Sequence, residues 1–117
     1  MKKILIVDDE HLVRWSVRQY LEAEGFVAVE ASSGPEALEI LTKDDISVLI
    51  TDLIMPEMNG VELIRRAKEF DPDLSVLVIT ADDSSGLVLS ATDAGALRTF
   101  NKPIPFVELV GALQALP

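Results

Sequence analysis

The sequence has no cysteine, so it offers neither a disulfide framework nor a thiolate metal site. It also lacks long hydrophobic runs, and no apolar stretch approaches the roughly 20 residues that a membrane-spanning helix needs. The apolar stretch at residues 4–7 is too short for a signal peptide, and two aspartates follow it instead of a cleavage site. These absences favour a protein of the reducing cytoplasm that does not bind a membrane.

Basic residues are scarce. The chain has 10 lysines and arginines against 20 aspartates and glutamates, which gives a net charge of −10. A reader of duplex DNA needs a basic face, so we expect no direct nucleic-acid binding by this chain. Hydrophobic residues make up 49% of the 117 residues, which is enough for one domain with a single core.

Short apolar runs alternate with helical patterns along the chain. The runs predict strands at residues 4–7, 26–31, 48–51, 74–80 and 97–100. Helical patterns lie between these runs: the first stops at Gly25, the fourth spans residues 84–93 and the last spans residues 104–116. Five such repeats predict an α/β fold with one five-stranded parallel sheet and five flanking helices. The strand order 2-1-3-4-5 is common for such a sheet.

Chemically active side chains follow the predicted strands. Asp8 and Asp9 follow the first strand, Asp52 the third and Thr80 ends the fourth, while the fifth strand runs into Lys102. Each residue alone has an ordinary interpretation as a helix cap, a turn or a strand end. In a parallel sheet, however, the carboxyl ends of all strands lie at one edge, where ligands bind. We therefore expect these five side chains to converge.

Three crowded carboxylates repel one another and need a cation. Oxygen ligands without histidine or cysteine suit a hard ion, and Mg²⁺ is the usual choice. A divalent ion, a hydroxyl and an ammonium together can hold phosphoryl oxygens, and a carboxylate can act as the nucleophile. The pattern therefore predicts phosphoryl transfer to an aspartate.

The chain resembles the receiver domains of bacterial two-component response regulators over essentially its whole length. The segments that carry the resemblance are Ile4-Leu5-Ile6-Val7-Asp8-Asp9-Glu10, Asp52-Leu53-Ile54-Met55-Pro56-Glu57-Met58-Asn59-Gly60, Thr80-Ala81, Ala94-Gly95-Ala96 and Phe100-Asn101-Lys102-Pro103. The resemblance implies a flavodoxin-like, CheY-like fold for a receiver domain at residues 1–117. It also implies a switch that catalyses only its own phosphorylation and dephosphorylation.

The resemblance assigns roles to individual residues. It implies that Asp52 is phosphorylated and that Asp8, Asp9, Asp52 and the main-chain carbonyl of Ile54 bind Mg²⁺. It further implies that Lys102 holds a phosphoryl oxygen and that the Lys102–Pro103 peptide bond is cis. Thr80 and Phe100 would form the switch: Thr80 moves toward the phosphoryl group, and Phe100 rotates into the space that Thr80 leaves.

The resemblance also implies partners. The phosphoryl group would come from a sensor histidine kinase or a phosphotransfer protein. The last two helices carry few charges, since Asp93 and Glu108 are the only ones in residues 84–96 and 104–117. We therefore expect the output contact, with a homodimer as one form of it, to use these helices and the fifth strand. Two alternatives stay open: a stand-alone receiver, or a receiver followed by an output domain after Pro117.

Two rival functions fit the sequence less well. A Mg²⁺ phosphatase with an aspartyl nucleophile typically has a second aspartate two residues later, where this chain has Ile54. A flavin-binding module of the same architecture needs a hydroxyl- or glycine-rich phosphate loop after the first strand. Asp8-Asp9-Glu10 would repel a phosphate there unless a metal intervened.

Overall fold

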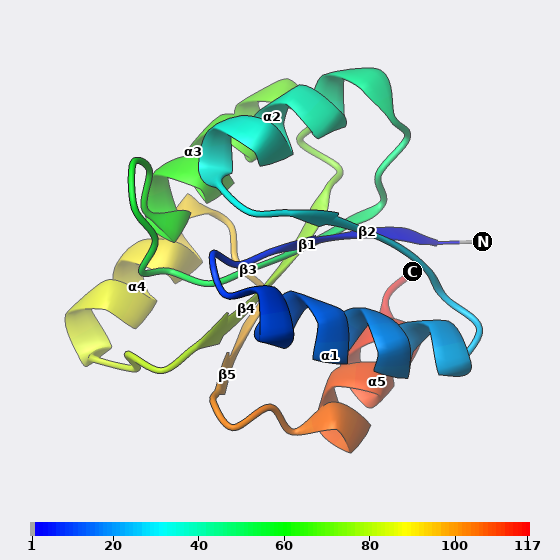
Figure 1. Ribbon diagram of the computed structural model, residues 1–117. Helices are drawn as coiled ribbons and strands as arrows, with labels where there is room; N and C mark the ends of the chain where they lie inside the picture. The colour runs from blue at the N-terminus through cyan, green and yellow to red at the C-terminus, as the bar shows by residue number, and fades with distance from the viewer. Residues whose placement is uncertain (1) are drawn as a thin grey trace.

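The computed structural model describes residues 2–117, in which five strands and five helices alternate (Figure 1). In chain order the elements are β1 (Lys3–Val7), α1 (His11–Ala23), β2 (Val27–Ala31), α2 (Gly34–Lys43), β3 (Val48–Thr51), α3 (Gly60–Phe70), β4 (Ser75–Thr80), α4 (Ser85–Ala94), β5 (Arg98–Asn101) and α5 (Phe106–Ala115). Neighbouring strands are parallel, and the sheet order is β2-β1-β3-β4-β5. The predicted fold class and strand order are confirmed.

The sheet carries a hydrophobic core on each face, because successive side chains of a strand point to opposite faces. In β4, Val76 and Val78 belong to the core under α2, α3 and α4, whereas Leu77 and Ile79 belong to the core under α1 and α5. Figure 1 shows these two groups of helices on opposite sides of the sheet. Burial on both faces explains why the strands appear in the sequence as continuous apolar runs.

Local signals in the sequence set several helix ends. The Ser33 hydroxyl accepts a hydrogen bond from the Glu36 amide at 3.3 Å at the start of α2. The Asn59 side chain accepts one from the Glu62 amide at 3.0 Å at the start of α3. Gly25, with a φ of 92°, follows the end of α1 in a conformation that favours glycine.

Several predicted boundaries differ from the structure by one or two residues, and those of α5 and β5 have a clear physical reason. Helix α5 begins at Phe106 rather than at residue 104 and ends at Ala115. Pro105 has no amide hydrogen and disfavours a helical conformation at the preceding Ile104, so the helix starts after both. Strand β5 is shifted one residue later than predicted, to Arg98–Asn101, because its pairing with β4 starts at Leu77↔Arg98.

Gly60 fixes the chain immediately behind the end of β3. Its amide donates a 2.8 Å hydrogen bond to the Leu53 carbonyl. A Cβ at this position would collide with the main-chain carbonyl of Asp52 and would lie 2.7 Å from the Leu53 Cα. The obstructing atoms are backbone atoms that cannot swing away, so α3 can start this close to Asp52 only because residue 60 is glycine.

We predict that Gly60→Ala lowers the free energy of unfolding by about 1–3 kcal/mol through overpacking. Gly111→Ala is the matched control, because a Cβ there meets nothing within 4 Å and Gly111 lies within α5. Alanine is the better helix former, so this control should gain up to about 1 kcal/mol. Urea unfolding measures both. A Gly60→Ala protein as stable as the parent would contradict the close approach of residue 60 to the backbone of Asp52.

Candidate functional site

The predicted functional residues converge at the carboxyl edge of the sheet. Asp8 and Asp9 follow β1, Asp52 follows β3, and Thr80 is the last residue of β4. Lys102 follows β5, and its amide donates a 2.9 Å hydrogen bond to the Thr80 carbonyl. At this edge lies a hollow of about 460 Å³, whose lining includes Asp9, Asp52, Thr80 and Lys102. Parallel pairing thus brings together residues that are far apart in the sequence.

Three carboxylates form the centre of the site. Asp8, Asp9 and Asp52 each offer an oxygen, and these oxygens lie within 4.8 Å of one another. Asp8 and Asp52 are buried, with 3% and 6% of their surfaces exposed, whereas Asp9 is exposed. Like charges at this spacing repel one another strongly where burial limits the screening by water.

Lys102 partly offsets this repulsion. Its Nζ donates hydrogen bonds of 2.9 Å to Asp8 Oδ2 and of 2.9 Å to Asp52 Oδ2. Glu10 lies farther away, with Oε1 at 3.7 Å from the same nitrogen, and its side chain is mostly exposed. The Lys102–Pro103 peptide bond is cis. One ammonium therefore bridges the two buried carboxylates, which originate from different strands.

Main-chain amides orient the other oxygens of the two buried carboxylates. Asp52 Oδ1 accepts hydrogen bonds from the amides of Leu53 at 2.6 Å and Ile54 at 3.2 Å. Asp8 Oδ1 accepts one from the Glu10 amide at 2.9 Å. The side chain of Ile54 does not enter the core, and 55% of its residue surface is exposed. Each buried carboxylate is therefore held on one oxygen by the backbone and on the other by Lys102.

The burial of the site shifts two pKa values. Burial raises the pKa of Asp8, although hydrogen bonds from the Glu10 amide and Lys102 act to lower it. Burial acts to lower the pKa of Lys102, but its hydrogen bonds and ion pairs with Asp52 and Asp8 outweigh this effect and raise it. Lys102 therefore stays positively charged. The contacts of Asp8 do not fully offset the cost of burying its negative charge.

The donor set fits a hard divalent cation. All three side chains present carboxylate oxygens, and no sulfur or imidazole takes part. Lys102 offsets one of the three carboxylate charges, so the cluster retains two negative charges for a cation to neutralise. Mg²⁺ usually binds through one or two carboxylates and keeps several waters. Asp9 is exposed, so this side of the cluster is open to water.

The structure does not bring Phe100 to Thr80. Thr80 has the same strand parity as Val78 and faces the side of α2, α3 and α4. Phe100 pairs with Ile79, is 3% exposed and packs in the core under α1 and α5. Because the two side chains lie on opposite faces of the sheet, Phe100 cannot rotate into a space that Thr80 leaves. The prediction that Phe100 moves into the space left by Thr80 is therefore wrong.

Two residues near the site were missed by the sequence analysis. Thr99 pairs with Val78 and so occupies the β5 position on the same face as Thr80. Its register against β4 identifies it, because Asn101, two residues later, pairs with Thr80, whereas counting alternate residues back from Lys102 leads to Phe100. Arg14 in α1 donates a 2.7 Å hydrogen bond to the main-chain carbonyl of Asp8. No sequence signal indicates that contact, since a long side chain can reach many partners.

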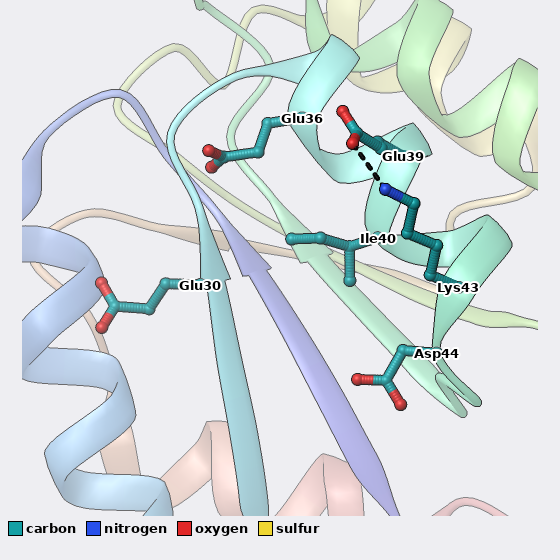
Figure 2. Close-up of a pocket in the computed structure, with 6 residues that line it drawn as sticks. All are labelled: Glu30, Glu36, Glu39, Ile40, Lys43 and Asp44. Carbon is teal, nitrogen blue, oxygen red and sulfur yellow. Dashed lines mark hydrogen bonds and ion pairs between the residues drawn. The ribbon is translucent and has the colours of Figure 1, made fainter.

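A second hollow, of about 420 Å³, lies between β2 and α2 (Figure 2). Its charged side chains are engaged within the protein. Glu39 accepts a 2.8 Å hydrogen bond from Lys43, and Glu36 accepts one of 2.6 Å from the Ser32 amide. Asp44 is paired with Lys3 at 2.7 Å. This hollow therefore shows no set of converging free groups comparable to that at the carboxyl edge of the sheet.

The family model of the response regulator receiver domain matches residues 4–114. The chain belongs to this family. A phosphoacceptor switch is the shared activity of receiver domains, which agrees with an aspartate cluster at the strand ends. Among residues 2–117, no helix is both long enough and apolar enough to cross a membrane.

Known proteins resemble this receiver in sequence and in structure. Response regulator MprA of Mycobacterium ulcerans (strain Agy99) is 38% identical over 114 residues, which cover 97% of this chain and 49% of that protein. This chain thus spans about half the length of such relatives. A CheY-like receiver domain protein of Methanospirillum hungatei JF-1 has a TM-score of 0.94 at 28% identity, with 97% and 91% of the two chains covered.

A third similar protein was solved as a complex. Response regulator TrrA of Thermotoga maritima, in complex with Mg²⁺-BeF, has a TM-score of 0.88 at 30% identity, and 97% of each chain is covered. This shows that a receiver of closely similar fold binds Mg²⁺.

We predict that metal-free receiver loses stability relative to Asp8→Asn as pH rises from about 4 to 7. A raised folded-state pKa means that the folded protein binds the Asp8 proton more tightly than the unfolded chain does. Ionisation of Asp8 therefore opposes folding. This cost develops as pH rises above the unfolded-state pKa of 3.8 and through the higher folded-state pKa. Urea unfolding with a chelator at both pH values measures this difference. A parent that gains stability relative to Asp8→Asn over this range would contradict it.

Proposed function

We propose that this receiver takes a phosphoryl group onto Asp52 from a sensor histidine kinase or phosphotransfer protein, with Mg²⁺ held by Asp8, Asp9 and Asp52. The observation that carries the proposal is the cluster of three carboxylates beside one hollow, two of which Lys102 bridges. Asp52 is the proposed acceptor because, of the two buried carboxylates that Lys102 bridges, it is the one that lines the hollow.

The residues of the site have separate roles in this proposal. Bound Mg²⁺ supplies charge neutralisation for the carboxylates and the transferring phosphoryl oxygens. A carboxylate oxygen of Asp52 attacks phosphorus and forms an acyl phosphate, while the phosphorus–nitrogen bond to the donor histidine breaks and the imidazole leaves. Lys102 exchanges its bond to Asp52 for one to a phosphoryl oxygen. Thr80, which lines the same hollow, donates its hydroxyl hydrogen to another.

Ile54 distinguishes this proposal from sustained phosphatase turnover. It lines the hollow, and its carbonyl is the proposed main-chain ligand of Mg²⁺. Its side chain has no acidic group, so it cannot protonate the leaving group of an outside substrate. We therefore propose that the receiver catalyses only its own phosphorylation and dephosphorylation.

We expect incubation with acetyl phosphate and Mg²⁺ to add one phosphoryl group to the parent and none to Asp52→Asn. Chelation should abolish the modification, because the carboxylates cannot receive a phosphoryl dianion until a cation offsets their charge. Intact-protein mass spectrometry measures the added mass. Asp45→Asn, an exposed aspartate near the opposite end of β3, is the control and should be modified like the parent. Phosphoryl addition to Asp52→Asn would exclude Asp52 as the acceptor.

We further propose that α4, β5 and α5 form the output surface and that a homodimer is one use of it. Three large apolar residues there are well exposed: Leu89 in α4 at 61%, Leu97 before β5 at 58% and Val107 in α5 at 78%. Exposed apolar side chains of this kind favour contact with another protein surface. An output domain, which the relatives' greater length suggests, is an alternative partner.

We expect a beryllofluoride mimic with Mg²⁺ to convert the parent from monomer to dimer in sedimentation. Leu89→Asp and Val107→Asp should each prevent this conversion, because a charge on the apolar surface would be buried without a partner. Val27→Asp is the matched control: Val27 begins β2, the strand at the opposite edge of the sheet from β5, and is 40% exposed. Monomers under every condition would refute the homodimer and leave the surface to an output domain.

A further inference from the structure

Arg14 connects three parts of the molecule next to the acidic cluster. It lies in α1, and only 13% of its side chain is exposed. Its Nη1 donates a 2.7 Å hydrogen bond to the Asp8 carbonyl, and its Nε donates one of 3.2 Å to Glu30 Oε1 in β2. Its Nη2 lies 3.4 Å from Nδ1 of His11, one turn earlier in the helix. The guanidinium is therefore fixed from three directions.

Glu30 anchors this guanidinium. Figure 2 shows its side chain on β2 pointing toward α1, away from the acidic residues of α2. Its other oxygen, Oε2, accepts a 3.3 Å hydrogen bond from Arg18 Nη1, and its side chain is 21% exposed. Arg14 and Arg18 thus share one carboxylate, but of the two, Arg14 makes the contact with Asp8.

The Asp8 carbonyl stands where the chain leaves the sheet. The Asp8 amide still pairs with the Ala31 carbonyl of β2 at 3.3 Å, and α1 begins three residues later at His11. The N-cap residue of α1, Glu10, makes no capping hydrogen bond with its side chain. The short connection is therefore held by the Asp8 carboxylate, which accepts from the Glu10 amide, and by Arg14, which binds the Asp8 carbonyl.

We propose that Arg14 is a positioning residue for the Mg²⁺ site, an inference that rests on the proposed function. By binding the main chain of Asp8, it sets the direction in which the Asp8 and Asp9 carboxylates leave the backbone toward Asp52. Residues that hold metal ligands in place typically change metal affinity by about 10–100-fold when removed. Arg14 acts on the backbone of two adjacent ligands from a separate helix.

A positioning role and a purely electrostatic role predict opposite effects on Mg²⁺ affinity. Arg14 is positive, so loss of its charge alone would strengthen the binding of a cation. Loss of its hold on Asp8 weakens binding, because the carboxylates no longer converge. The sign of the change in the dissociation constant therefore decides between the two roles.

Isothermal titration with MgCl₂ on the full chain tests the proposal. We expect Arg14→Ala to raise the Mg²⁺ dissociation constant by about tenfold. Arg14→Lys should also raise it, because it keeps the charge but lacks the fork that reaches both Asp8 and Glu30. Arg18→Ala is the matched control: it removes a charge from the same network without touching Asp8, so its dissociation constant should equal that of the parent. Urea unfolding of each variant checks that it is folded under the titration conditions.

Phosphorylation by acetyl phosphate provides a second readout. Arg14→Ala should need more Mg²⁺ for half-maximal rate, yet reach the parent's rate at saturating Mg²⁺, because the reacting groups are unchanged. Unchanged or tighter Mg²⁺ binding in Arg14→Ala, or an equal loss in Arg18→Ala, would overturn the positioning role. A parent that binds no Mg²⁺ would instead refute the proposed function itself, so the two failures are distinguishable.

Discussion

The repulsion among three carboxylates at one edge of the sheet is the constraint on which the arrangement of the site depends. Parallel pairing of β1 and β3 places the acidic residues side by side, and hydrophobic cores on both faces of the sheet hold the strands there. Lys102 offsets one charge, and main-chain amides orient the remaining oxygens. The cluster is therefore folded but electrostatically incomplete, which is the basis of the proposed binding of Mg²⁺ and of a phosphoryl group.

Much of the fold and the site was predictable because strands buried on both faces leave a clear pattern. Continuous apolar runs located the strands to within one or two residues, and parallel topology then placed Asp8, Asp52 and Lys102 at a common edge. This inference needed no side-chain geometry, since the strand ends alone determine which residues meet. The end of α1 was predicted because a glycine, Gly25, marks it.

The failures of prediction have physical causes as well. Phe100 was assigned to the wrong face of the sheet, because β5 is only four residues long and its alternation is difficult to read without its register against β4. The start of α5 was placed before Pro105, although proline there delays the helix. The contact between Arg14 and Asp8 depends on the packing of α1 beside β2, which no local pattern of residues reports.

The lack of space at Gly60 limits which mutations this receiver can tolerate. Every amino acid that a single nucleotide change can introduce in place of glycine carries a Cβ, and a Cβ there meets the backbone behind Asp52. Asp52 can therefore be displaced by mutations that replace no charged residue. In a screen for inactive alleles, this uncharged position should be represented alongside the aspartates.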